Sequence, residues 1–377
     1  RIPGDRRLAI SRDEGEERQK VYVRIEDERA LGIVREAFVR GEGQSSAQVK
    51  LAGEDEWERL IFPSLERELR AELTDKAGTA AVRVFADNLR HLLMQPPIKG
   101  RVTLGVDPGF RTGCKLAVVY ANGKVLETGV GHFTLPGQDR PAAQAQVLIL
   151  GMGKQHGVTG IAIGNGTASR EAERFIASLL PLLPEGVQYT IVSEAGASVY
   201  SASKLAAEEF PQFDVSLRSA VSIARRMQDP LAELVKIDPK AIGVGQYQHD
   251  LKETQLNDAL DGVVESCVNA VGVEVSTASA ALLSHVAGIG PALAKNIVTY
   301  RDESGTASRA QLKKVPKLGP KAFEQCAGFL RVVDSRHVLD ATGVHPESYG
   351  AAEALLEQLG FSKAGGRAGK LADLAAK

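Results

Sequence analysis

The chain has 377 residues, 44% hydrophobic and 25% charged, with a formal net charge of −1. This composition is typical of a folded protein with about two to four domains and argues against wholesale disorder. The longest aliphatic run, Val147–Leu150, is far too short to cross a membrane. The three cysteines form no Cys-x-x-Cys pair and the histidines lack metal-ligand spacing. We therefore expect no disulfide framework, no cysteine or histidine metal site, and a reducing, cytoplasmic compartment.

Residues 1–99 are highly charged and predict a mostly helical scaffold region, with a helical binding platform as the alternative. Apolar residues recur with a period close to 3.6 in segments 60–73 and 82–93, and Pro96-Pro97 should stop the second of these helices. The alternating segment Val21–Ile25 is typical of a short strand, and the acidic cluster Asp13–Glu17 is typical of a loop.

Residues 100–228 predict alternating strands and helices. Strands are expected at 102–107, 115–121, 124–130, 158–163 and 188–192, and helices at 142–156, 169–180, 201–209 and 216–227. Asn122-Gly123 is a strong hairpin signal between the second and third strands. The order β-β-β-α-β-α-β-α predicts an RNase H-like mixed sheet with flanking helices, in contrast to the strict alternation of a dinucleotide-binding fold.

Residues 229–281 are expected to form a helical connector, with a helix at 256–271. Residues 282–335 contain an internal repeat at an offset of 29, in which Leu283, Gly290 and Pro291 match Leu312, Gly319 and Pro320. Each copy predicts a helix, a tight glycine turn and a second helix that begins with proline. The pattern resembles tandem helix-hairpin-helix units, and residues 336–377 are expected to form a C-terminal helical segment.

The paired glycine turns suit contact with phosphate. Glycine lets the backbone take positive φ and come close to a ligand, and the unpaired amides at a helix start favour an anion. The nucleic-acid-binding residues predicted here are Gly288, Gly290, Lys295, Lys317, Gly319 and Lys321. Because Lys317 stands where the first copy has Gly288, we expect the second turn to bind less well. The alternative is an ordinary αα-hairpin that only packs helices in a protein-interaction scaffold.

The charge of this region agrees with a phosphate-backbone contact. Between Ser276 and Arg336 nine lysine and arginine residues stand against four acidic ones, a local balance of +5 within a nearly neutral chain. Such a basic segment is the electrostatic footprint of a nucleic-acid binder, and a solvated basic face is the alternative. Nothing in the repeat reads base edges, so binding should be largely independent of sequence and sensitive to salt.

The segment GVDPGFRTG places Asp107 at the end of the first predicted strand, where RNase H-like nucleases hold a metal-binding carboxylate. Hydrolysis with two metal ions needs several more carboxylates. The next strand ends supply Asn165 and Glu194, and helix 216–227 has no acid but has three arginines, which we expect to face the site and repel a cation. We therefore predict that Asp107, Asn165 and Glu194 are vestigial, with a metal-dependent nuclease or resolvase that uses Asp107 as the alternative. An ATPase would need a second Asp-x-Gly segment after an apolar strand, and Asp13-Glu14-Gly15 lies in a charged run.

Several long strings resemble one family, the bacterial transcription accessory proteins of the Tex type. They include LGVDPGFRTGCKLAVV (104–119), SEAGASVYSAS (193–203), VGQYQHD (244–250), VVESCVNAVGVEVSTAS (263–279) and LDATGVHPESY (339–349). The resemblance implies a helical N-terminal region, a YqgF-type RNase H-like domain, tandem helix-hairpin-helix units and a C-terminal OB-fold RNA-binding domain. The chain starts at Arg1 and stops at Lys377. We therefore expect a fragment that lacks the first part of the helical region and the OB-fold domain.

Together, these patterns predict a multidomain α and α/β protein without enzymatic activity or cofactor. It would bind the backbone of RNA or DNA without strong sequence preference and would not act at a membrane, and the family resemblance implies that it acts with the transcription machinery.

Overall fold

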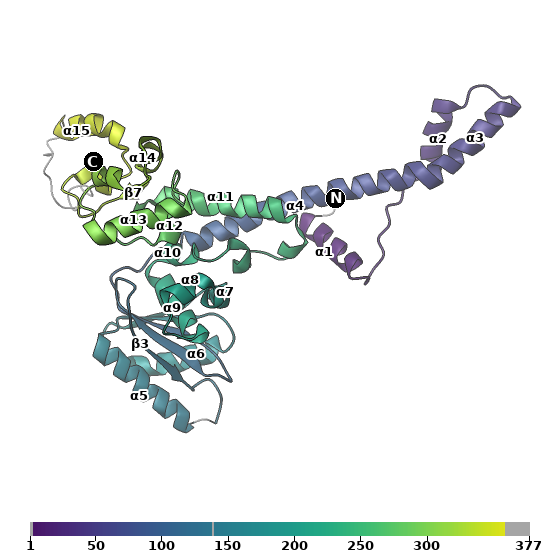
Figure 1. Ribbon diagram of the computed structural model, residues 1–377. Coiled ribbons are helices and arrows are strands. Elements are labelled where there is room, and N and C mark those ends of the chain that lie inside the picture. The colour runs from purple at the N-terminus through teal and green to yellow at the C-terminus, as the bar shows by residue number, and fades with distance from the viewer. Residues whose placement is uncertain (1–2, 138, 359–377) are drawn as a thin grey trace. The chain divides into compact units, whose positions relative to one another are not determined.

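The computed structural model describes residues 3–137 and 139–358. The chain divides into two compact units, one made of Arg1–Asn88 and Val244–Ala259 and the other of Leu89–Gly243 and Leu260–Lys377. Figure 1 labels helices and strands of the two units. Within the described ranges, no helix is sufficiently long and apolar to span a bilayer.

The first unit is helical, as the sequence predicts. Its N-terminal part consists of α1 (Gly4–Gly15), α2 (Asp27–Phe38), α3 (Gln44–Glu56), a π-helical turn (Trp57–Ile61) and the first part of α4 (Phe62–Leu93). The two periodic segments lie in one continuous helical run formed by the π-helical turn and α4, and Pro63, the only proline of α4, directly follows that turn. The helix ends at Leu93, before Pro96-Pro97.

Two local predictions in this unit are wrong. Val21–Ile25 is extended but is not a strand, because no neighbouring strand pairs with it, and the Val23 amide donates instead to the Glu66 carboxylate at 3.1 Å. The segment Asp13–Glu17 is not wholly a loop, because α1 continues to Gly15. The ion pair of Arg12 with Glu16, one turn later, supports that helical end.

The second unit contains a five-stranded mixed sheet. Its strands are β1 (Thr103–Asp107), β2 (Cys114–Val119), β3 (Val125–Gly131), β4 (Gly160–Gly164) and β5 (Gln188–Val192), in the order β3-β2-β1-β4-β5. The pairs β1–β2 and β2–β3 are antiparallel, whereas β1–β4 and β4–β5 are parallel. Gly123, with φ +85°, makes the hairpin turn. The predicted mixed sheet is confirmed.

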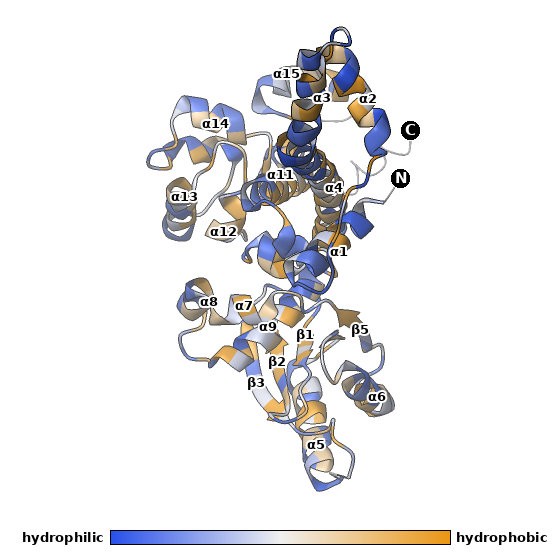
Figure 2. Ribbon diagram, turned by 90° about the vertical axis from the view of Figure 1, so that its right-hand side faces the viewer, coloured by the Kyte–Doolittle hydropathy of each residue, from blue (hydrophilic) through white to orange (hydrophobic). Residues whose placement is uncertain are grey.

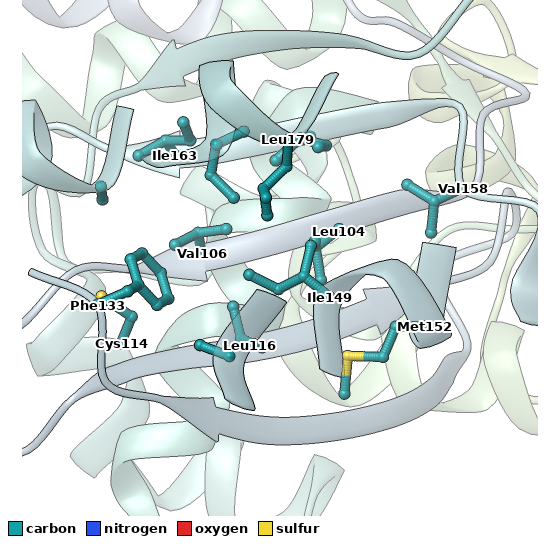
Figure 3. Close-up of a cluster of buried hydrophobic side chains, with 14 of the residues drawn as sticks. Leu104, Val106, Cys114, Leu116, Phe133, Ile149, Met152, Val158, Ile163 and Leu179 are labelled. Carbon is teal, nitrogen blue, oxygen red and sulfur yellow. The ribbon is translucent and has the colours of Figure 1, made fainter. Parts of the chain in front are cut away.

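Helices cover both faces of this sheet. They are α5 (Asp139–His156), α6 (Ser169–Leu179), α7 (Ala197–Ala202), α8 (Lys204–Glu209) and α9 (Val215–Gln228). Alternate residues of a strand point to opposite faces, so Leu104 and Val106 pack with Ile149 and Leu179 of α5 and α6, as Figure 3 shows. The opposite face packs against α9.

The approach of α9 explains the glycine in β1. A Cβ atom at Gly105 would lie 2.2 Å from the Ala220 carbonyl oxygen and 2.9 Å from the Ala224 Cβ. Ala117 of β2 and Ala162 of β4, also small, are buried on the same side of the sheet. Small residues across three strands therefore bring α9 close to the end of β1, where Asp107 lies.

The rest of the second unit is mostly helical. It contains α10 (Pro230–Leu234), most of α11 (Glu253–Val271), α12 (Ala280–Leu283), α13 (Pro291–Ser304), α14 (Pro320–Cys326), α15 (Tyr349–Gln358) and two short strands, β6 (Val273–Glu274) and β7 (Leu330–Arg331). The parallel pairing of Val273 with Leu330 joins the two ends of the segment that holds the internal repeat. Of the predicted C-terminal segment 336–377, α15 is helical, and residues 359–377 lie outside the described residues.

Candidate functional site

The two copies of the repeat have the same backbone at the turn. Gly288 has φ +80° and Lys317, the matching residue, has φ +67°. The glycines two residues later, Gly290 and Gly319, are both extended, with φ −83° and ψ 170° in the first and φ −72° and ψ 168° in the second. Each precedes a proline that opens a helix, α13 or α14. A lysine thus takes the left-handed conformation that the first copy gives to glycine.

The first helix of each predicted hairpin is shorter than expected. In the first copy α12 has only four residues, and in the second copy Arg309–Lys314 forms a 3₁₀ helix. The apolar positions of both copies are nonetheless buried. They are Leu283, Val286, Ile289, Ala294 and Ile297 in the first copy and Leu312, Val315, Leu318, Phe323 and Cys326 in the second. Tertiary burial therefore holds each short helix in place.

The copies pack against each other in a reciprocal way. Asn296 of α13 donates a hydrogen bond to the Pro316 carbonyl in the turn of the second copy, at 3.0 Å. Gln325, the residue that matches Asn296 at the offset of 29, lies against Gly288 in the turn of the first copy. A Cβ atom at Gly288 would be 2.8 Å from the Gln325 Cβ. The same position in each copy thus meets the turn of the other, as in a pseudo-twofold pair.

The helix starts beyond the turns are exposed to solvent. Gly290 and Gly319 are exposed, and no atom lies within 4 Å of a Cβ atom built on either. Within the described ranges the Gly290 amide has no acceptor, whereas the Gly319 amide donates to the Lys317 carbonyl at 3.1 Å. The first amides of α13 have no carbonyl partner in their own helix. The first copy therefore presents main-chain donors at an open surface.

Lysine side chains surround these turns. Five are exposed and form no ion pair with any residue that the structure describes: Lys295, Lys313, Lys314, Lys317 and Lys321. One of them, Lys313, places its ammonium 5.0 Å from the centre of the Phe323 ring. In Figure 2 hydrophilic residues colour much of α13 and α14. The five lysines outnumber the exposed acids of the same two helices, which are Asp302 and Glu303 of α13 and Glu324 of α14.

Three of the arginines counted in this basic segment donate hydrogen bonds to main-chain carbonyls of the fold. Arg301 donates to the Ala278 carbonyl at 2.6 Å, and Arg331 donates to the Gly328 carbonyl at 2.7 Å. Arg309 is 1% exposed and donates to the Tyr349 hydroxyl and to four carbonyls, those of Leu330, Asp340, Thr342 and Val344. The charge count alone could not separate these structural arginines from the surface lysines.

The end of the sheet brings the three predicted carboxylate-site residues together. Asp107 ends β1, Asn165 follows β4 and Glu194 follows β5, and these parallel strands end at one edge. The Asn165 side-chain oxygen accepts the Glu194 amide at 3.0 Å, and the Glu194 carboxylate lies against Gly166. Burial raises the pKa of Asp107, while a hydrogen bond from Ser219 and the charge of Lys115 oppose that shift. Burial, and then the charge of Asp107, raise the pKa of Glu194.

The prediction that three arginines of α9 face this site is wrong for two of them. Arg218 donates to the carbonyls of Ser201 and Phe210, and Arg225 donates to the Gly123 carbonyl in the β2–β3 turn. Only Arg226 lies near Glu194, and it donates to the carbonyls on either side of that residue. Arg218 and Arg225, seven residues apart, share a face of α9, whereas Arg226 points about 100° away from Arg225 and so reaches other carbonyls.

The residue of α9 that acts on Asp107 is Ser219, which opposes the rise of its pKa and which the sequence alone did not indicate. A serine hydroxyl can donate to a carboxylate but brings no negative charge. Among the residues that the structure describes, no group of three or more histidine, cysteine, aspartate or glutamate side chains is arranged to hold a metal ion. The pair Asp107 and Glu194 therefore lies at this edge with Asn165 and Ser219 as neutral neighbours.

Comparisons with known proteins agree with this architecture. Residues 101–228 match the family described as the Tex protein YqgF-like domain, residues 268–331 match the helix-hairpin-helix motif, and residues 337–376 match a helix-hairpin-helix domain. The last match falls on the segment that was predicted only as helical.

Relatives from distant organisms are similar over most of this chain. The protein YdcI of Bacillus subtilis is 51% identical over 94% of this chain and 49% of its own length. The transcriptional accessory protein Tex of Neisseria gonorrhoeae is 54% identical over 82% of this chain and 40% of its own length. The human S1 RNA-binding domain-containing protein 1 is 50% identical over 74% of this chain and 28% of its own length. The chain thus spans half or less of the length of these curated relatives.

Proposed function

We propose that this chain, which belongs to the Tex family, binds nucleic acid through its paired hairpins as an accessory factor of transcription, and that its RNase H-like domain is not catalytic. The observation that carries the proposal is the helix start at Gly290, an exposed residue whose amide has no acceptor in the described chain. A helix start attracts a phosphate because its free amides and its dipole both favour an anion.

The five exposed lysines around the turns support the same ligand. They would contact the sugar-phosphate backbone, which every sequence shares, so affinity should depend on salt more than on base sequence. Aromatic residues make up only 5% of the chain, which gives little support for binding by base stacking. The name of the Neisseria gonorrhoeae relative supports an accessory role in transcription.

The test is direct binding of the 377-residue chain to labelled single- and double-stranded DNA and RNA of scrambled sequence, over a series of salt concentrations. We expect affinity that varies little with sequence and falls steeply with salt. Charge reversal at Lys295 and Lys321 together should weaken binding, whereas reversal at the exposed Lys124 and Lys154 together changes the net charge equally and serves as the matched control. Absence of binding at low salt, or binding that ignores salt, would refute the proposal.

The lack of acidic residues in α9 supports the absence of catalysis. Cleavage assisted by two metal ions needs a cluster of carboxylates, and α9 contains no aspartate or glutamate that could join Asp107 and Glu194. Branched DNA, RNA and RNA–DNA hybrid should remain intact with Mg²⁺ or Mn²⁺. Cleavage that disappears in the Asp107→Asn variant would establish the alternative, a metal-dependent nuclease or resolvase.

A further inference from the structure

We propose that the two hairpins hold the nucleic-acid backbone by different chemical means. The first hairpin uses main-chain amides at Gly290 and the start of α13, whereas the second uses lysine side chains, with Lys317 as its principal contact. This division between the hairpins rests on the proposed function and assigns to one of its five lysines, Lys317, the main contact of the second hairpin.

The backbone of Lys317 is the first observation. A non-glycine residue with positive φ is uncommon, and among the residues that the structure describes only Glu17, Ala168, Tyr247 and Lys317 have one. Glycine takes this conformation without steric cost and stands at the matching position of the first copy. The backbone conformation of the turn alone would therefore favour glycine. We infer that the lysine at this position contributes through its charged side chain and not through the turn.

The distribution of charge is the second observation. Four of the five unpaired lysines, Lys313, Lys314, Lys317 and Lys321, belong to the second copy, and only Lys295 belongs to the first. The second copy holds one exposed acid, Glu324, so its lysines leave a surplus of positive charge that an anion would offset. The second hairpin thus carries the side-chain charge that the first hairpin lacks.

The main-chain donors are distributed in the opposite way. The Gly319 amide is already engaged by the Lys317 carbonyl, and α14 has only 7 residues. The Gly290 amide has no acceptor in the described chain, and it opens α13, which has 14 residues. Amide contact is therefore strongest at the first hairpin, where the lysines are fewest.

Packing between the copies explains why the first turn cannot carry a lysine. Gln325 lies where a side chain at Gly288 would begin. At the second turn the matching residue, Asn296, reaches the carbonyl of Pro316 and leaves Lys317 exposed. Only the second turn has room for a charged side chain, so the two copies can specialise.

The experiment compares three variants of the whole chain: Lys317→Gly, Lys317→Asn and Lys317→Arg. Glycine and asparagine both accept a positive φ but remove the charge, whereas arginine keeps it. One lost phosphate contact should lower the magnitude of the slope of log K against log salt by about 0.7–0.9 and weaken binding about 5- to 10-fold near 0.1 M salt. The Arg variant should bind as the parent chain does. Lys154→Gln, which removes an exposed charge on α5, is the matched control.

Thermal unfolding separates this role from a structural one. Lys317→Gly should unfold at the same or a higher temperature than the parent chain, even though it binds less well. If Lys317→Gly and Lys317→Asn keep the parental affinity and salt slope, while Gly290→Asp weakens binding, the division between the hairpins is overturned and the proposed function stands. If the parent chain fails to bind at low salt, the proposed function itself fails. Polyglutamate and an unlabelled oligonucleotide of the same charge can each be used to displace the labelled oligonucleotide. If the two displace it equally well, the chain binds any polyanion, and the proposal that nucleic acid is its ligand is overturned.

Discussion

Substitution of Gly290 by aspartate should separate binding from stability. Gly290 precedes α13 with φ −83° and ψ 170°, a conformation that any residue can adopt, and no atom lies within 4 Å of a Cβ atom built there. Aspartate is among the best residues at this position because its carboxylate accepts the free amides of the first turn. The same carboxylate would occupy the donors that we assign to a phosphate and would repel it.

The two effects have opposite signs and measurable sizes. The cap and its interaction with the helix dipole should raise the free energy of unfolding by about 0.3–1 kcal/mol. Loss of hydrogen bonds between amides and a charged phosphate should cost about 1.5–3 kcal/mol of binding, or roughly 10- to 150-fold in Kd. Fluorescence anisotropy with a labelled oligonucleotide measures the second effect, and denaturant unfolding measures the first.

Gly151→Asp is the matched control, because it makes the same substitution at an exposed site of α5, where no atom lies within 4 Å of a Cβ atom built on the glycine. It should reduce affinity only slightly. A folded Gly290→Asp variant that binds as tightly as the parent chain would refute the assignment of the phosphate to the start of α13.

Three further predictions concern other parts of the chain. Arg309→Ala should destabilise the second unit by about 3–5 kcal/mol, because it leaves several buried carbonyls without a donor, and denaturant unfolding should detect the loss. Gly105→Ala should cost about 1–3 kcal/mol or more, since the new methyl group would overlap the Ala220 carbonyl, and a variant as stable as the parent would contradict the close packing of α9. Asp107→Asn should stabilise the protein near neutral pH: the raised pKa means that ionised Asp107 opposes folding, and this cost appears as pH rises through the folded pKa. The stabilisation should vanish in acid, where Asp107 is protonated in both states, and an equal gain at every pH would contradict it.

The fold could be predicted from the sequence where local periodicity and burial agree. All five strands of the sheet follow from apolar runs bounded by turn residues, and Asn122-Gly123 fixes the hairpin. Val21–Ile25 alternates as a strand does, but a strand needs a partner, which periodicity does not reveal. The short α12 and the 3₁₀ turn Arg309–Lys314 escape prediction for a related reason, because tertiary packing sets their length.

The candidate site was predictable as a list of residues but not as an arrangement. Parallel strand order brings Asp107, Asn165 and Glu194 to one edge, as the sequence analysis expects for residues at strand ends. The influence of Ser219 on Asp107 was not foreseen, because a neutral serine does not stand out beside the acids and arginines that indicate or exclude a metal site. Arg218, Arg225 and Arg226 share a helix, but each side chain follows the nearest carbonyl, and only three-dimensional packing determines which one that is.

The repeat itself explains why two similar turns can differ in chemistry. Each copy must bury the same five apolar positions and place the residue two positions before its extended glycine in a left-handed conformation. That requirement fixes the backbone but leaves the side chain free wherever the other copy does not cover it. Gln325 covers the first turn and excludes a side chain there, whereas Asn296 leaves the second turn open. A lysine can therefore replace glycine in one copy without loss of the shared geometry, so that a fold built from a duplicated unit gains a cationic contact on one side.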